Sequence, residues 1–159
     1  MTWTKKEQDF LKDLQNDEKV CIEKYRRAAE SACDTTLKNI FNGIEQAEQH
    51  HYDTLTQMLS GTMPQPKKGG KQQGKQQQQS QQPAPGSLKS KASRAEKQQD
   101  AFLLADLLST EKYVSAEYNT AVFEFKSPEA RQLLSGIGTQ EQNHGKQLAD
   151  YMMANNMYC

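Results

Sequence analysis

Apolar residues recur at intervals of three and four in four separate segments of the chain. This spacing matches the turn of an α-helix and predicts four amphipathic helices, and therefore an all-α fold. The four apolar stripes consist of Phe10, Leu11, Leu14, Cys21, Ile22, Tyr25, Ala28 and Ala29; of Leu37, Ile40, Phe41, Ile44, Ala47, Leu55, Met58 and Leu59; of Leu103, Leu104, Leu107, Val114, Tyr118, Ala121, Val122 and Phe125; and of Leu133, Leu134, Ile137, Leu148 and Met152.

Residues that favour helix ends flank these segments. Small polar side chains cap the free N–H groups at helix starts, and glycine suits the position after a helix end. The predicted caps are Thr4 with Glu7, Asp34 or Thr35, Ser93 with Glu96, and Ser127 before Pro128, while Gly61 follows the second segment.

The second half of the chain repeats the first without a gap when the sequence is shifted by 93 residues, the interval between Glu18 and Glu111. Matching pairs include Asp13-Leu14 with Asp106-Leu107, Tyr25 with Tyr118, Gly43-Ile44 with Gly136-Ile137, and Leu55 with Leu148. Such a repeat indicates duplicated structural units. Each copy contains two helices with a short connection, which predicts antiparallel neighbours. We therefore expect helical hairpins at residues 1–61 and 96–159 that together form one four-helix bundle domain.

Residues 62–95 differ from both copies. They are rich in Gln, Gly and Pro, and they carry seven Lys or Arg residues and no Asp or Glu. With few apolar side chains, such a segment cannot offset the entropy lost on ordering. We interpret it as a flexible basic linker, and its length favours a ferritin-like bundle with a long crossover over the up-down-up-down type. We also hypothesise that its Gln and Lys side chains form isopeptide cross-links through a transglutaminase.

Composition limits the classes of function. The formal net charge is zero, and the linker lacks interleaved aromatic residues, so we expect no nucleic-acid partner. No apolar run approaches the roughly 20 residues that span a bilayer, so we expect no membrane partner. Residues 1–10 lack the features of a secretory signal, so we expect the chain to be made and kept in the cell. Of the three cysteines, Cys21 falls on an apolar stripe, and Cys159 is either incidental or a cross-linking site.

Polar residues interrupt the apolar stripes at matching positions of the two copies. Glu18 and Glu111 lie on the first and third stripes. The second and fourth stripes each carry a Glu-x-x-His motif. Its two side chains lie one turn apart on one face of the helix. The six residues are Glu18, Glu48, His51, Glu111, Glu141 and His144.

Burying four carboxylates in one core is costly unless their charge is compensated. Two divalent cations would balance four carboxylates, and this pattern of single Glu and Glu-x-x-His residues is that of di-iron and di-manganese bundles. The ligand types suit Fe or Mn and are compatible with Zn. The alternative is a metal-free, partly protonated layer of hydrogen bonds and ion pairs that fixes helix register. The sequence leaves both interpretations open.

Two tyrosines follow the single glutamates by seven residues. Tyr25 and Tyr118 either donate a hydrogen bond to a ligand carboxylate or are ordinary core aromatics. His50 is rotated away from the stripe and is expected to face solvent. The sequence contains no phosphate-binding loop, nucleophile elbow or Cys–His pairing, so no catalytic residue and no other cofactor is assigned.

The second copy resembles the coat F domain of spore-forming bacteria. The resemblance lies in Asp106-Leu-Leu-Ser-Thr-Glu-Lys112, Tyr118-Asn-Thr-Ala-Val-Phe-Glu-Phe125, Ser127-Pro-Glu-Ala-Arg131, Glu141-Gln-Asn-His144 and the Tyr-Met-Met end, and the first copy is a more divergent match. This resemblance implies a ferritin-like fold and a structural or accessory role in the endospore coat. The chain would be made in the mother-cell cytoplasm and assembled with other coat proteins.

The ligand set separately resembles those of bacterioferritin and rubrerythrin. This second resemblance implies an alternative function, a di-iron or di-manganese redox enzyme that consumes peroxide or oxygen. Because the coat F family is named for its location, we favour the coat protein over the enzyme. Whether the bundle forms a homo-oligomer, or exchanges hairpins between chains, is left open by the sequence.

Overall fold

A computed structural model of the chain describes residues 2–64 and 88–158, which form four helices and no strand. Helix α1 spans Lys5–Ser31, α2 spans Thr35–Leu59, α3 spans Arg94–Glu124 and α4 spans Pro128–Ala154. Each predicted segment is a helix, so the all-α prediction is confirmed over the described part of the chain. None of these helices combines the length and apolar character needed to cross a bilayer.

The predicted capping residues begin all four helices. Thr4 with Glu7 and Ser93 with Glu96 form complete capping boxes at α1 and α3. The side chains of Asp34 and Ser127 accept hydrogen bonds from backbone N–H groups of α2 and α4. Of the two residues proposed to cap the second helix, Asp34 therefore does so.

Glycine ends α2, as its position predicted. Gly61 adopts a positive φ of 82°, which costs an L-residue with a side chain more than it costs glycine. Its N–H donates to the Met58 carbonyl at 2.9 Å, and the N–H of Thr62 donates to the Gln57 carbonyl at 3.0 Å. These two bonds form a Schellman motif that satisfies the last carbonyl groups of the helix.

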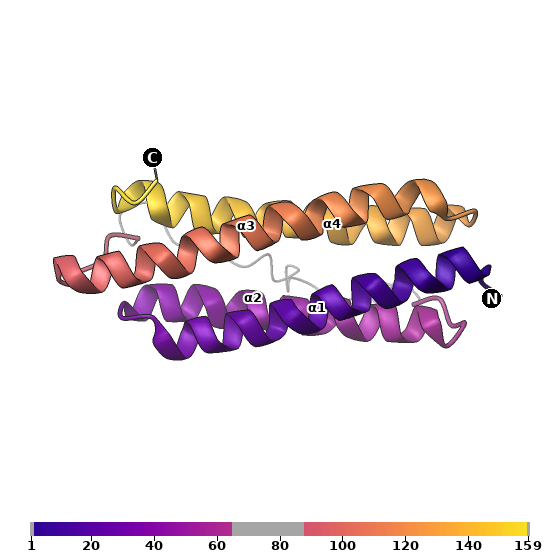
Figure 1. The fold of residues 1–159 in the computed structure, drawn as a ribbon, viewed down its shortest axis with the longest axis horizontal. Coiled ribbons are helices and arrows are strands. Elements are labelled where there is room, and N and C mark those ends of the chain that lie inside the picture. The colour runs from indigo at the N-terminus through magenta and orange to yellow at the C-terminus, as the bar shows by residue number, and fades with distance from the viewer. Residues whose placement is uncertain (1, 65–87, 159) are drawn as a thin grey trace, which may run out of the picture.

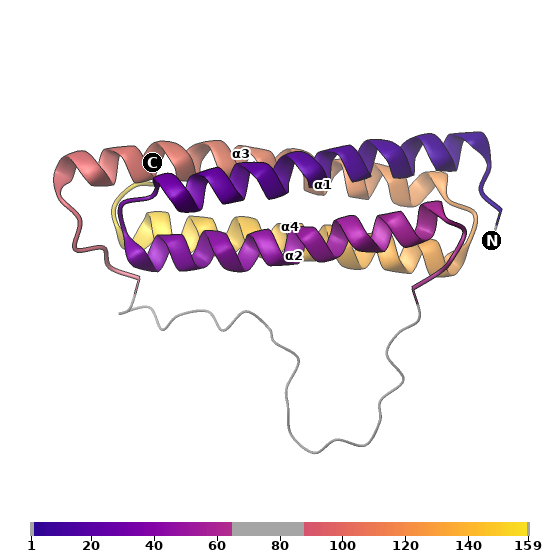
Figure 2. The ribbon, with the colours of Figure 1, turned by 90° about the horizontal axis from the view of Figure 1, so that it is seen from below.

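The helices pack as two antiparallel hairpins laid side by side. In Figure 1, α1 runs beside α2 and α3 beside α4, each pair in opposite directions, as the short connections predicted. Further contacts join α1 to α3 and α2 to α4. Helices α2 and α3 run in the same direction, so residues 64 and 88 lie at opposite ends of the bundle (Figure 2). A connection from the end of α2 to the start of α3 therefore has to span the length of the bundle.

The segment interpreted as a linker is partly packed. Residues 65–87 lie outside the described residues, and the proposed cross-linking Gln and Lys side chains fall mostly there. Leu88, however, is buried in the core, and its carbonyl accepts a 2.8 Å hydrogen bond from the Asn155 side chain. The N–H of Ser90 donates to the same side chain at 2.8 Å. Helix α3 then begins at Arg94, within the range 62–95 that was interpreted as linker.

The apolar core consists of two clusters, one toward each end of the bundle. One contains Tyr25, Phe41, Leu104 and Tyr151, and the other contains Trp3, Leu14, Leu55, Tyr118 and Leu134, each with further aliphatic residues. On every helix, the boundary between the clusters falls near the polar residues that interrupt the stripe. Cys21 is buried in the second cluster, as expected, whereas Cys159 lies outside the described residues.

Each hairpin also supplies a carboxylate that caps the turn of the other. Buried Glu7 on α1 accepts a 3.0 Å hydrogen bond from the backbone N–H of Lys126, in the connection between α3 and α4. Buried Asp100 on α3 accepts from the backbone N–H groups of Cys33 and Asp34, at 2.8 and 3.2 Å, in the connection between α1 and α2. Because Glu7 and Asp100 are themselves 93 positions apart, the two contacts correspond under the repeat.

Glu7 provides a pH-dependent test of this contact. Burial raises its pKa, but hydrogen bonds from the backbone of Lys126 and from Thr4 outweigh burial and lower the pKa below its ordinary value of 4.5. Glu7→Gln leaves one carbonyl oxygen for two sets of donors, so we expect a loss of about 1–3 kcal/mol in the free energy of unfolding at pH 7. Urea denaturation monitored by circular dichroism measures this loss.

The loss should shrink as the pH is lowered. The ionised Glu7 of the native protein stabilises the fold fully above pH 4.5, and this contribution disappears as pH falls through the lower pKa of the folded state. Asp13→Asn, at an exposed carboxylate of the same helix, is the control and should change stability little at either pH. A Glu7→Gln loss that is the same at pH 7 and pH 3 would contradict the role of the ionised carboxylate.

Candidate metal centre

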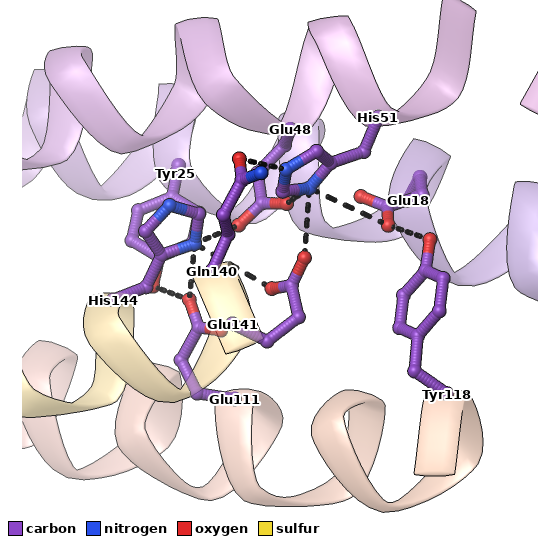
Figure 3. Close-up of polar contacts among 9 residues, drawn as sticks. All are labelled: Glu18, Tyr25, Glu48, His51, Glu111, Tyr118, Gln140, Glu141 and His144. Carbon is purple, nitrogen blue, oxygen red and sulfur yellow. Dashed lines mark hydrogen bonds and ion pairs between the residues drawn. The ribbon is translucent and has the colours of Figure 1, made fainter. Parts of the chain in front are cut away.

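The six polar residues of the apolar stripes meet in the middle of the bundle (Figure 3). They are Glu18 from α1, Glu48 and His51 from α2, Glu111 from α3, and Glu141 and His144 from α4. All six are buried, with residue exposures between 0% and 4%. The helical period explains the gathering, because each residue occupies a stripe position and each Glu-x-x-His pair lies one turn apart on one face. His50, by contrast, is exposed, as predicted.

The donor atoms form two groups that share two carboxylates. The first group contains Glu18, Glu48, His51 and Glu141, and the second contains Glu48, Glu111, Glu141 and His144. In each group the donor atoms lie within 4.8 Å of one another. Glu48 and Glu141 belong to both groups, whereas each group has its own histidine and its own single glutamate.

The distances show which oxygen of each shared carboxylate lies near which histidine. Nδ1 of His51 lies 2.7 Å from Glu141 Oε1 and 3.1 Å from Glu48 Oε2. Nδ1 of His144 lies 3.0 Å from Glu48 Oε1 and 3.5 Å from Glu141 Oε2. Each shared carboxylate therefore turns one oxygen toward each histidine. The single glutamates lie farther out, with Glu18 Oε1 at 3.7 Å from His51 Nδ1 and Glu111 Oε1 at 3.8 Å from His144 Nδ1.

The two tyrosines hold the single glutamates from the opposite hairpin. The hydroxyl of Tyr25 donates to Glu111 Oε1, and the hydroxyl of Tyr118 donates to Glu18 Oε1 (Figure 3). Both tyrosines are fully buried. Of the two roles considered for them, the structure shows the hydrogen bond to a cluster carboxylate. The seven-residue spacing does not pair each tyrosine with the glutamate of its own helix.

Without metal, protons would divide unevenly over this cluster. Burial, reinforced by the charges of Glu48 and Glu141, raises the pKa of Glu18 to about 8 and that of Glu111 to about 10. Burial acts on Glu48 and Glu141 as well, but close contacts with the two histidines keep the pKa of both carboxyl groups below the ordinary value. The same contacts raise the pKa of His51 and His144 against the effect of burial. A metal-free layer at neutral pH would thus hold two carboxylates, two carboxylic acids and two imidazolium groups, with no net charge.

Charge balance alone, however, leaves the layer short of hydrogen bonds. Among the described residues, the buried side-chain atoms without a hydrogen-bond partner are Glu18 Oε2, Glu48 Oε1, Glu111 Oε2, Glu141 Oε1, Glu141 Oε2 and His144 Nδ1. All of them belong to the six residues of the cluster. An unsatisfied buried polar group costs about 1–3 kcal/mol. Glu48 Oε1 and His144 Nδ1 are only 3.0 Å apart, yet the two atoms do not meet in a directed hydrogen bond.

The donor set therefore fits a pair of divalent cations. Each group offers one imidazole nitrogen and three carboxylates, a combination that suits Fe, Mn or Zn. Four carboxylates would balance the charge of two such ions, and the atoms without hydrogen bonds would become ligands.

One polar contact of the cluster was not predicted from the sequence. Nε2 of His51 lies 2.9 Å from Oε1 of Gln140, which reaches it from α4. Gln140 is exposed and lies outside the apolar stripe, so its position gave no sign of this contact. Its place directly before Glu141 is the signal that could have indicated it.

Comparison with known proteins places one family match on the second hairpin. Residues 99–158 match the family model of the Coat F domain. The match begins inside α3 and runs past the end of α4, so it includes Glu111, Glu141 and His144. No curated protein and no solved structure matches the chain.

Two glycines of α4 test the packing around Tyr118. A methyl group on Gly138 would lie 3.1 Å from Tyr118 Cβ, whereas a methyl group on Gly136 would meet nothing within 4 Å. Gly136→Ala should stabilise the protein by about 0.5–1 kcal/mol, because alanine favours a helix over glycine. Gly138→Ala should lose this gain and cost about 1–3 kcal/mol through overpacking against the ring that donates to Glu18. Chemical denaturation of the two variants measures the difference, and equal stabilisation would contradict the close approach of α3 and α4.

Proposed function

We propose that this chain is a ferritin-like bundle of two duplicated hairpins that holds two divalent metal ions and serves in the coat of bacterial endospores. The metal site is supported by one observation above all, the shared pair of carboxylates between two Glu-and-His groups. Ferritin-like di-metal proteins use the same set, one Glu from each of two helices and Glu-x-x-His from each of the other two. The antiparallel hairpins and the long crossover agree with that fold.

Each ion would be held by residues of both hairpins. Glu18 and His51 would hold one ion, and Glu111 and His144 the other, with Glu48 and Glu141 between them. The first group takes three residues from the first hairpin and one from the second, and the second group does the reverse. Bound metal would supply positive charge where four buried carboxylates meet. Its structural effect would be to tie the two hairpins together, which suits a protein of a durable assembly.

The coat assignment rests on the Coat F match over the second hairpin. In this proposal the chain is made in the mother cell, joins the coat with other coat proteins, and does not depend on redox turnover. The bundle supplies a rigid unit, since its core and cross-hairpin caps involve both hairpins.

Metal binding predicts a stoichiometry and a pattern among variants. Titration of metal-free protein with Mn²⁺, followed by calorimetry and elemental analysis, should show two ions per chain. At a free concentration 100 times the dissociation constant, each ion should stabilise the fold by about 2.7 kcal/mol. Glu48→Gln should weaken the binding of both ions because Glu48 belongs to both groups, whereas Glu18→Gln should weaken the binding of one ion.

Glu45→Gln is the matched control for these variants. Glu45 lies on the same helix, pairs with Arg26 and does not belong to either group, so the change should leave the stoichiometry and affinity unaltered. Circular dichroism confirms that each variant is folded before titration. Absence of Mn²⁺, Fe²⁺ and Zn²⁺ binding by the wild-type protein, or equal binding by wild type and Glu48→Gln, would overturn the metal proposal.

Location tests the other half of the proposal. A tagged full-length chain expressed in a sporulating bacterium should be recovered in the extracted coat fraction of purified spores. The same tag on an unrelated cytoplasmic protein is the control and should stay out of that fraction. Recovery of the chain only from the mother-cell lysate would exclude the coat role without affecting the metal proposal.

A further inference from the structure

The two histidines of the cluster differ in the hydrogen-bond partner of Nε2, the ring nitrogen that faces away from the carboxylates. Nε2 of His51 has the Gln140 side chain at 2.9 Å, which reaches across from the other hairpin (Figure 3). For Nε2 of His144, residues 2–64 and 88–158 provide no hydrogen-bond partner. The repeat gives the reason, because the residue 93 positions before Gln140 is Ala47, which has no polar side-chain atom.

The remaining polar contacts of the two groups correspond. Each histidine turns Nδ1 toward a single glutamate and both shared glutamates, and each single glutamate accepts a hydrogen bond from a tyrosine. The six cluster residues and the two tyrosines thus correspond between the two halves of the repeat, whereas Gln140 does not have a counterpart with a polar side chain. The histidines also differ slightly in exposure, with the side chain of His51 1% exposed and that of His144 6% exposed.

A partner on Nε2 matters because a histidine that binds metal through Nδ1 keeps its proton on Nε2. The carbonyl oxygen of Gln140 can accept that proton in a hydrogen bond, which fixes the ring orientation and the tautomer that leaves the Nδ1 lone pair free. Removing such a partner typically lowers metal affinity about 10- to 100-fold. His144 would bind metal without this support.

We infer that the two metal positions are unequal, and that Gln140 is the positioning residue that makes the Glu18–His51 position fill before the Glu111–His144 position. This inference rests on the proposed metal centre. The ligands of the two positions are the same in kind, so the difference in affinity comes from the residue behind each histidine.

Gln140 is well placed for a test because it is exposed and not part of the core. Gln140→Ala removes the amide behind His51, so that both metal positions then have an alanine at the corresponding site of the repeat. Ala47→Gln places a matching amide behind His144. Gln142→Ala is the control, since Gln142 is also an exposed glutamine of α4 and belongs to neither donor group.

The experiment is a titration of the full-length, metal-free chain with Mn²⁺, followed by calorimetry and by electron paramagnetic resonance. Wild type should bind in two separate steps, and at one equivalent it should show the spectrum of isolated Mn²⁺ with little signal from coupled pairs. Gln140→Ala should weaken the first step about 10- to 100-fold and bring the two steps together. The second step should stay near its wild-type affinity.

Two further variants separate positioning from a general structural effect. Gln140→Glu keeps an acceptor behind His51 and should retain two separate steps, whereas Ala47→Gln should tighten the second step. Two equal steps in wild type, or two separate steps that persist in Gln140→Ala, would overturn the inference while leaving the metal centre in place. Absence of any Mn²⁺ binding by wild type would overturn the proposed metal centre, and this inference with it.

Discussion

The structure depends on the burial of four carboxylates and two imidazoles at the centre of a bundle that is otherwise apolar. Each carboxylate oxygen placed there needs a proton, a hydrogen bond or a cation, because burial removes the hydration that the ionised group has in water. The cluster divides the core into two apolar parts and contacts all four helices. A shift of any helix along its axis would separate a carboxylate from its partners, so the cluster fixes the register of the whole bundle.

The contacts that surround this centre run mainly between hairpins. Tyr25 and Tyr118 each cross to the glutamate of the other hairpin, and Glu7 and Asp100 each cap the other hairpin's turn. The apolar stripes would let two hairpins pack in several ways. These crossed polar contacts favour the observed arrangement, because it satisfies the centre and both ends of the bundle together.

The sequence predicted what depends on the face of a single helix. Glu48 and His51 interrupt an apolar stripe, so their direction toward the core followed from the helical period alone. Contacts between helices could not be predicted from the helical period. Tyr118 meets Glu18 rather than Glu111, and exposed Gln140 reaches His51, because the packing of α1 with α3 and of α2 with α4 sets these pairs. The burial of Leu88 was not predicted for a similar reason, since the fold brings its core partners to it.

Gln140 and Ala47 have a consequence for how such a bundle acquires new properties. Two identical hairpins that associate as separate chains are related by symmetry, so any residue behind one histidine is also present behind the other. A single chain that carries both hairpins is free of this restriction, and one substitution can change one half alone. The difference between Gln140 and Ala47 is of this kind, since it leaves every cluster residue in place yet distinguishes the two halves. Covalent joining of the halves thus opens a way for one centre to evolve two roles.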